Sequence, residues 1–146
     1  MPFLPLLEEP LSDGVVTLRA SAERDIPEVL IAYQDDPELH GALGEQRPPS
    51  GAALGRRAER AEDDRLAGLA ITLAILESGS DLCRGEVRVD EVDWGSRTAA
   101  LRVWVAPQAR GQGLGRRAHE LVREWLGERC HLEVRCVATA PPGPAG

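Results

Sequence analysis

The sequence has no lysine and no asparagine, few aromatic residues, and only three cysteines in 146 positions. All 17 basic residues are therefore arginine, so no lysine can act as a general base or form a Schiff base. Aromatic residues make up 3% of the chain, and we expect an aliphatic core. Cys83, Cys130 and Cys136 form neither a CxxC pair nor an even disulfide set, which is typical of reduced thiols in a cytoplasmic protein. Cys130 and Cys136 either line a site or are simply buried.

Long apolar runs and an excess of positive charge are also missing. No stretch approaches the roughly 20 consecutive apolar residues of a membrane span. The first residues have no basic segment ahead of their apolar ones, which argues against a secretory signal. A net charge of −7 argues against a general nucleic-acid binder, because contacts with phosphates need surplus positive charge. We therefore expect no membrane and no nucleic acid as partners, and a cytoplasmic location.

The pattern of apolar residues predicts a single α/β (α+β) domain over residues 1–139, followed by a disordered tail at 140–146. An irregular, proline-punctuated segment is expected up to Gly14. The order of the later elements, a hairpin meander closed by one β-α-β unit, implies a mixed, mostly antiparallel sheet with helices on both faces. The expected strands are 15–19, 69–76, 82–92, 98–105 and 132–137, and the expected helices are 26–35, 52–66 and 114–126.

Several local signals set the expected ends of these elements. Asp25 is placed to cap the first helix, with Glu28 completing a capping box. Residues 41–51 are rich in glycine and proline and indicate a loop. The nearly continuous apolar run at 69–76 is typical of a strand covered on both faces. Gly127 is expected to end the last helix.

The segment with the clearest chemistry joins the strand at 98–105 to the helix that follows it. The first N–H groups of a helix have no intrahelical partner and carry partial positive charge. Gly111, Gly113 and Gly115 lack Cβ atoms, so a phosphate can approach the backbone there. The segment therefore predicts a site for a diphosphate. Further positive charge comes from three nearby arginines, Arg110, Arg116 and Arg117.

The spacing of the glycines separates this loop from two common phosphate loops. Gly-Gln-Gly-Leu-Gly does not match the GxGxxG pattern of dinucleotide sites, and Arg116-Arg117 stand where a nucleoside-triphosphate loop has Lys-Ser/Thr. The loop matches Arg-x-x-Gly-x-Gly from Arg110 to Gly115, after a strand that ends in Val-Ala-Pro. This combination resembles the pyrophosphate loop of the GNAT N-acetyltransferase superfamily. Residues 99–107 are similar to the branch that acetylates the N-termini of ribosomal proteins.

The resemblance implies the acyl-CoA N-acyltransferase fold and acetyl-CoA as acyl donor, with no metal. It places the strand at 103–105 along the pantetheine arm, splayed from its parallel neighbour at 132–137. The backbone N–H of Val105 would polarise the thioester carbonyl, and a primary amine of a small molecule or peptide would attack directly in a ternary complex. The residues it assigns to acetyl-CoA are Val103, Trp104, Val105, Arg110, Gly111, Gln112, Gly113, Leu114, Gly115 and Arg116.

The catalytic residues stay unassigned. The matching branch often has a glutamate where this chain has Ala100. His119 and His131 have no partner at metal-ligand spacing, so no zinc site is expected. The acids left near the expected cleft are Glu86, Asp90, Glu91, Asp93 and Glu133.

The chain also stops after the fifth expected strand, without the final helix and hairpin of the family. That part commonly supplies a tyrosine that protonates the leaving thiolate, and the only tyrosine here is Tyr33 in the first helix. A shortened gene, a partner that covers the exposed strand edge as in a homodimer, or a domain that binds acyl-CoA without catalysis would each explain this. The sequence therefore leaves two functions, an active N-acetyltransferase and an inactive acyl-CoA-binding or protein-interaction module.

Overall fold

The structure is a computed structural model, and it describes residues 3–135. Its six strands form one sheet in the order of the sequence. Every neighbouring pair is antiparallel except β5 and β6, which are parallel. The expected mixed, mostly antiparallel sheet is therefore confirmed. The strands are β1 (Leu11–Ser12), β2 (Val16–Ala20), β3 (Ile71–Glu77), β4 (Gly85–Asp93), β5 (Thr98–Val105) and β6 (Glu133–Arg135).

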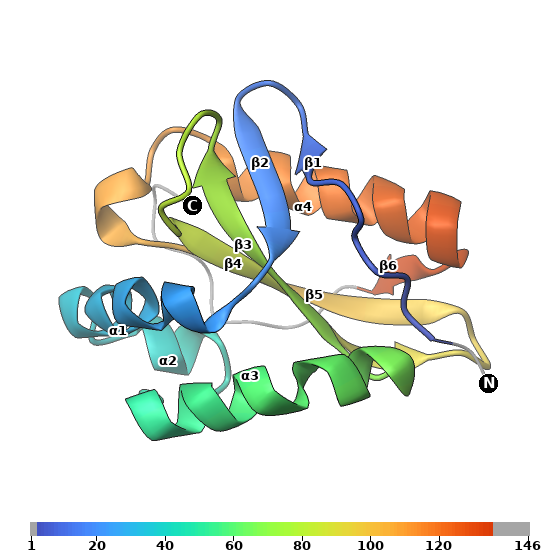
Figure 1. Cartoon of the computed structure of the whole chain (residues 1–146), viewed down its shortest axis with the longest axis horizontal. Coiled ribbons are helices and arrows are strands. Elements are labelled where there is room, and N and C mark those ends of the chain that lie inside the picture. Colours follow the sequence, from blue (N-terminus) through green and yellow to red (C-terminus); the bar gives the residue numbers. More distant parts are fainter. Residues whose placement is uncertain (1–2, 136–146) are drawn as a thin grey trace.

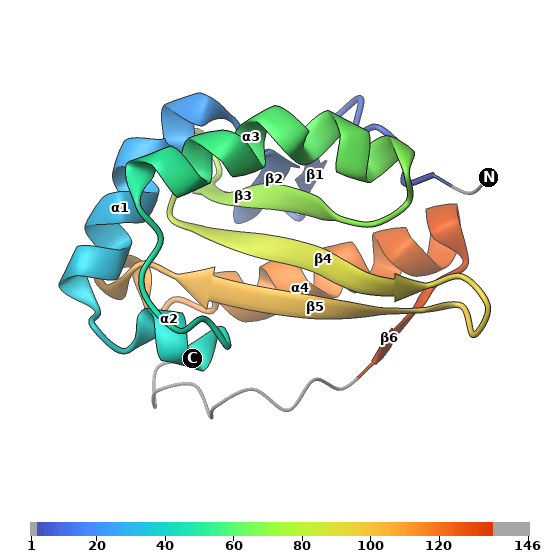
Figure 2. The same cartoon turned by 90° about the horizontal axis from the view of Figure 1, so that it is seen from below.

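Helices cover both faces of this sheet (Figure 1). One face carries α1 (Ile26–Asp35), α2 (Leu39–Ala42) and α3 (Gly51–Leu66), and the other carries α4 (Leu114–Trp125). Figure 2 shows β3, β4 and β5 running side by side through the middle of the molecule. The prediction of helices on both faces is confirmed, and β5 has the predicted bounds.

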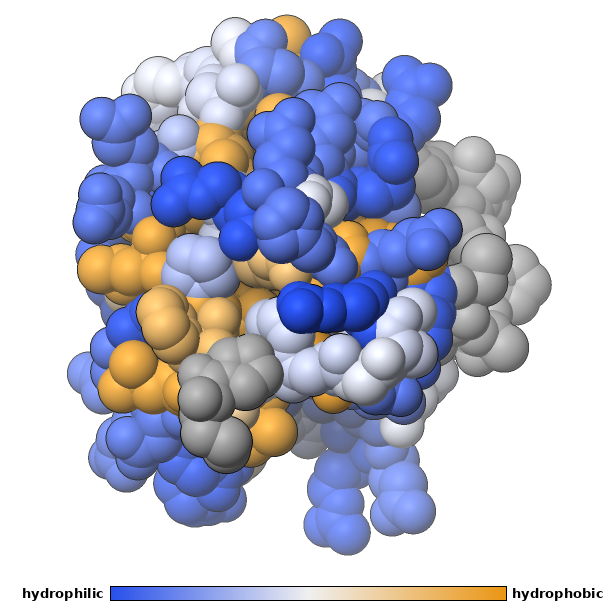
Figure 3. Space-filling model, turned by 90° about the vertical axis from the view of Figure 1, so that its right-hand side faces the viewer, coloured by the Kyte–Doolittle hydropathy of each residue, from blue (hydrophilic) through white to orange (hydrophobic). Residues whose placement is uncertain are grey.

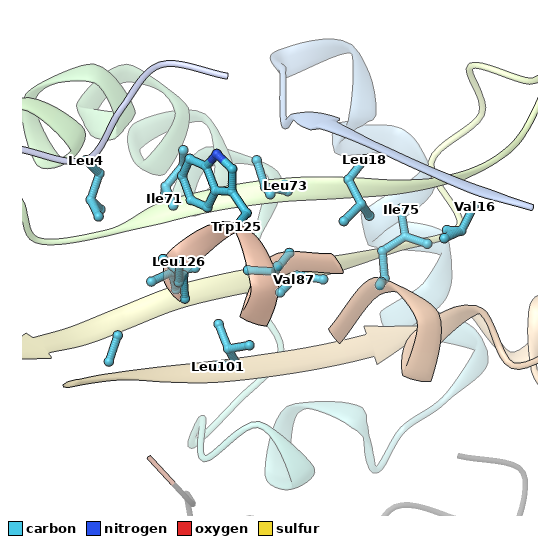
Figure 4. Close-up of a cluster of buried hydrophobic side chains, with 14 of the residues drawn as sticks. Leu4, Val16, Leu18, Ile71, Leu73, Ile75, Val87, Leu101, Trp125 and Leu126 are labelled. Atoms are coloured by element: carbon cyan, nitrogen blue, oxygen red, sulfur yellow. The ribbon is translucent and has the colours of Figure 1, made fainter. Parts of the chain in front are cut away.

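Two separate groups of buried side chains fill the two faces. The larger group lies between the sheet and α4, and Figure 4 shows part of it, including Leu73, Ile75 and Leu126. The smaller group lies under α1 and α3, and it includes Ala74 and Leu76. Successive residues of β3 thus belong to different groups, which explains its nearly continuous apolar run.

Three local expectations at the N-terminal half were wrong. The carboxylate of Asp25 does not cap α1, because it accepts hydrogen bonds from Arg19 and from the amide of Ala22 at 2.9 Å. The bidentate pair with Arg19 is the stronger interaction. The expected loop at 41–51 is partly helical, because α2 (Leu39–Ala42) extends into its first two residues. The burial of Leu39 holds this short helix against the core. The expected irregular lead-in contains β1, which pairs with β2.

The end of α4 also differs from the expectation. Gly127 does not end the helix, because the chain continues through a π-helical turn at Leu126–Cys130. Leu126 and Cys130 are both buried, so the turn continues the packing of α4 against the sheet. His131 ends it in the left-handed conformation, with φ of 55°. The later part of the expected strand at 132–137 and the expected tail at 140–146 lie outside the described residues.

Apolar surface remains where the N-terminal segment passes α3. The amide of Leu4 donates to the carbonyl of Arg65 at 3.0 Å and holds the segment there. Phe3, Leu6 and Leu66 are each more than half exposed. Figure 3 faces the side of the molecule where the chain begins and shows patches of hydrophobic surface among hydrophilic residues.

Candidate active site

The loop between β5 and α4 leaves a group of backbone amides without partners. Gly111 and Gly113 have φ of 82° and 76°, a conformation that favours glycine. Gly113 precedes the first residue of α4, and no side chain caps the helix. Among the residues that the structure describes, the amides from Gly111 to Arg116 have no hydrogen-bond acceptor. This is the arrangement that binds an anion at a helix N-terminus.

Gly115 allows α4 to approach β5 closely. A Cβ atom at this position would lie 3.2 Å from Cγ2 of Val105 and 3.5 Å from Cγ1 of Val103. The first turn of the helix therefore lies directly against the end of the strand. This contact brings the free amides of the loop next to the last residues of β5.

The backbone of Val105 points away from β4. Val105 opposes Gly85, and the amide of the next residue, Ala106, donates to the carbonyl of Arg84 at 2.7 Å. Val105 and Gly85 therefore form a non-hydrogen-bonded pair, in which the N–H and C=O groups of each residue point away from the other strand. The N–H of Val105 consequently points toward the side of β5 where β6 pairs farther along the strand.

Arg110 joins this strand end to α1. Its Nε donates to the carbonyl oxygen of Val105 at 2.9 Å, and its Nη2 donates to Oδ2 of Asp36 at 2.6 Å. The hydrogen bond from Arg110 lowers the pKa of the Asp36 carboxyl below its ordinary value. Beside this pair, Gln108 donates to Asp35 at 2.5 Å. The part of the loop that follows β5 is thus fixed by polar contacts.

The structure brings the ten residues predicted to bind acetyl-CoA into one region with different roles. The side chains of Val103 and Val105 pack on the α4 face, and Trp104 is buried on the opposite face. Leu114 is buried as part of the core. Among the ten, Gly111, Gln112 and Arg116 are exposed. The expected splay of 103–105 from the strand at 132–137 involves residues beyond 135 and so lies outside the described residues.

Four of the five candidate acids are held by other contacts or lie exposed. Arg102 pairs with Asp90 at 3.2 Å and also with Glu91. Asp93 accepts from the amides of its turn, which lowers its pKa. Glu133 is exposed on β6.

Glu86 is the exception. It is only 7% exposed and lies beside Trp104, whose Nε1 donates to Glu86 Oε1 at 3.2 Å. Burial raises the pKa of the Glu86 carboxyl. In the β4–β5 ladder Glu86 opposes Trp104, the residue next to Val105. A carboxyl of raised pKa thus lies opposite the residue that precedes Val105.

A small pocket opens beside Glu86. It has a volume of about 10 Å³ and is lined by Leu43, Glu86, Arg88, Arg102 and Trp104. Sequence reasoning did not single out Arg88. The signal was present, since Glu86, Arg88 and Asp90 are polar residues on one face of a strand whose other face carries Val87 and Val89.

Tyr33 lies on the same side of the sheet as this pocket. Its hydroxyl donates to Oε1 of Glu45 at 2.6 Å, and its ring centroid is 6.0 Å from that of Trp104. Burial, followed by the contact with Glu45, raises the pKa of the Tyr33 hydroxyl. A hydroxyl that is already donating and resists ionisation is poorly suited to proton transfer.

Between residues 3 and 135 no group of three or more His, Cys, Asp or Glu side chains is arranged to hold a metal ion. In the same part of the chain, no helix is long and apolar enough to cross a membrane. Cys83 and Cys130 are free and buried, and burial raises the pKa of both thiols, to about 12 and about 11 respectively. Neither cysteine is therefore a ready nucleophile.

Known structures share this fold. An acetyltransferase from Salmonella typhimurium that modifies the N-terminal serine of a 50S ribosomal subunit protein superposes with a TM-score of 0.73 at 14% identity, covering 85% of this chain and 71% of its own. A spermidine N-acetyltransferase from Vibrio cholerae, in complex with CoA and spermine, gives 0.68 at 17% identity, covering 82% and 68%. At these identities the likeness shows the fold alone.

Sequence comparison shows the family. No curated protein gives a significant sequence match to the chain. The family model of the acetyltransferase (GNAT) domain, in contrast, matches residues 16–142 and so spans β2 to β6 and the glycine-rich loop. The chain belongs to the GNAT acetyltransferase family, whose members are acyl-CoA-dependent N-acetyltransferases that use acetyl-CoA as donor.

Proposed function

We propose that this protein moves the acetyl group of acetyl-CoA to a primary amine by direct attack within a ternary complex. The observation that carries the proposal is the row of unpartnered amides from Gly111 to Arg116, set beside the outward-facing N–H of Val105. The first group suits a diphosphate, and the second suits a carbonyl oxygen. Both lie at the same end of β5.

The loop fits the diphosphate of acetyl-CoA because its glycines leave room at the backbone. Gly111 has no atom within 4 Å of the position where a Cβ would be, and Gly113 has only an arginine tip at 3.7 Å. Arg116 is exposed and forms no ion pair among the described residues, so its charge is available to a phosphate. The partial positive charge at the start of α4 adds to this attraction.

Val105 would stabilise the transition state. Negative charge develops on the thioester oxygen as the amine attacks, and an N–H fixed in a strand can meet it without reorganisation. The hydrogen bond from Arg110 to the Val105 carbonyl holds the end of the strand in place. In known acyl-transfer sites a single donor of this kind lowers the activation barrier by about 3 kcal/mol.

We assign the role of proton acceptor to Glu86. The attacking amine must be neutral and must lose a proton during transfer. Glu86 is the only one of the five candidate acids that is buried and free of an arginine pair. Its raised pKa brings it nearer to the operating range of a general base.

The test is an acetyl-transfer assay with a panel of amines, in which free CoA thiol is measured. Gly113→Asp places a negative charge in the loop and should abolish CoA binding in calorimetry. The matched control is Gly55→Asp in α3, where a Cβ meets no atom within 4 Å, and it should bind CoA normally. Folded protein that binds CoA but acetylates no amine would instead favour an acyl-CoA-binding module. Unchanged CoA affinity in Gly113→Asp would contradict the assigned loop.

A further inference from the structure

Arg88 has no carboxylate partner, although two neighbouring arginines, Arg57 and Arg102, each have one. It lies half-buried on β4, on the face covered by α1 and α3. Within residues 3–135 it forms no ion pair, and its Nε is buried without a hydrogen-bond partner. On the same face, Arg102 pairs with Asp90 and Glu91, and Arg57 pairs with Glu45 at 3.6 Å.

A buried Nε–H without an acceptor costs free energy unless something else compensates it. Arg88 lines the small pocket together with Glu86 and Trp104. Its planar fork of donors matches a carboxylate, which can accept two parallel hydrogen bonds from it. The side chain therefore has the charge and geometry of an anion-binding group.

Glu86 and Arg88 give this pocket one acidic and one basic side chain. They stand two residues apart on one face of β4, which is a separation of about 7 Å along the strand. Trp104 donates to Glu86, and no ion pair links Glu86 to Arg88. A ligand with an amine toward Glu86 and a carboxylate toward Arg88 would complement both groups.

We propose that the acetyl acceptor is a small amine that also carries a carboxylate, bound through that carboxylate by Arg88. The inference rests on the proposed function, since it takes the pocket beside Trp104 as the acceptor site. It sets this chain apart from an enzyme for polyamines, because a second ammonium group would be repelled by Arg88.

Leu43 closes the pocket. It is the only lining residue that does not come from the sheet, and it follows the short helix α2. The volume of about 10 Å³ holds no more than a water molecule. Entry of an acceptor therefore requires the Leu43 side chain to move outward, and the adjacent Gly44, with φ of 79°, has open space around it.

The test compares each amino carboxylate with its own amide, for example glycine with glycinamide and β-alanine with β-alaninamide, and adds spermidine. We expect kcat/KM for the wild type to favour the carboxylates about tenfold or more, the scale of one charge-assisted contact. Arg88→Gln should remove this preference, so that kcat/KM for each carboxylate falls to that for its own amide. Arg88→Lys should keep part of it, and Arg60→Gln, at an exposed position of α3, should keep all of it.

Several results would overturn the inference. Equal or better transfer to amides or spermidine by the wild type would do so even if Arg88→Gln did not fold. A preference that survives in Arg88→Gln, or no transfer to any carboxylate-bearing amine, would do the same. Calorimetry with CoA alone separates the two proposals, because absence of CoA binding contradicts the proposed function, while binding with the wrong acceptor preference contradicts only the acceptor class.

Discussion

Arg110 and Val105 are joined by a hydrogen bond of 2.9 Å from the guanidinium Nε to the backbone carbonyl oxygen. The bond closes the turn that leads from β5 into the glycine-rich loop. Because the same side chain also pairs with Asp36, the end of α1, the end of β5 and the loop are held as one unit. The orientation of the Val105 peptide therefore depends on a residue five positions later.

The contact of Arg110 predicts a structural role that Arg116 does not share. Arg110→Met should lower the free energy of unfolding by about 1–3 kcal/mol, since it removes charge-assisted hydrogen bonds from a half-buried site. It should also lower kcat, because the Val105 N–H is less well positioned. Arg116→Met should change stability by less than about 0.5 kcal/mol and weaken only CoA binding. Chemical denaturation and steady-state kinetics on both variants check this, and equal stability losses would contradict it.

The pair of Asp36 and Arg110 predicts a pH dependence of stability. The pKa of the Asp36 carboxyl is lowered from 3.8 by the hydrogen bond from Arg110. Its stabilising contribution is thus present above 3.8 and is lost as the pH falls through the lower, folded-state value. Asp36→Asn should be less stable than the wild type at about pH 7, and the difference should shrink in acid. Denaturation at several pH values measures this; a constant difference would show that the ion pair contributes nothing.

Glu86 predicts opposite effects on activity and on stability. Its pKa is raised by burial, so the protonated form is favoured in the fold, and that stabilisation is lost as the pH rises through the folded-state pKa. Glu86→Gln, which resembles the protonated form, should melt higher than the wild type at about pH 8 and equally at about pH 4.

The same variant should lose about a hundredfold or more in kcat if Glu86 accepts the proton. In the wild type, the rate should fall as the pH drops through the raised pKa, and this acid limb should be absent from the residual activity of Glu86→Gln. A variant with normal kcat would remove Glu86 from the mechanism, whatever its melting temperature.

Two positions after α4 should gain stability on substitution, Gly127 by losing its glycine and His131 by becoming one. Gly127 lies in helical backbone with open space around it, so Gly127→Ala should stabilise the protein by about 0.5–1 kcal/mol. His131 has φ of 55°, so His131→Gly should also stabilise, by about 1 kcal/mol. Thermal unfolding checks both changes. Destabilisation by Gly127→Ala would restore Gly127 as the helix terminator.

The sequence contained enough to place β2 to β6 and the glycine-rich loop, but not β1 or the pairing of charges. Alternation along 98–105 and the spacing of Gly111, Gly113 and Gly115 are local features, so they could be read directly. Asp25 was assigned wrongly because its strongest partner, Arg19, lies on a strand before the helix and is brought near only by the fold.

The role of Arg88 was missed for a related reason. Its significance comes from what its neighbours do, since Arg102 and Arg57 have partners and Arg88 has none. Such an absence depends on three elements meeting over one face of the sheet. The raised pKa of Glu86 depends in the same way on its burial under α1 and α3. The positions of the acidic residues along the chain do not reveal that burial.

The most direct test of the account is a titration of isotope-labelled protein with CoA, followed by the backbone amide resonances. We predict that the amides of Gly111, Gln112, Gly113 and Gly115 shift most and saturate together, with Val105 responding as the pantetheine arm binds. The amides of α3 should stay in place. Binding of CoA without any shift in the loop, or no binding by folded protein, would contradict the central claim that these amides hold the diphosphate.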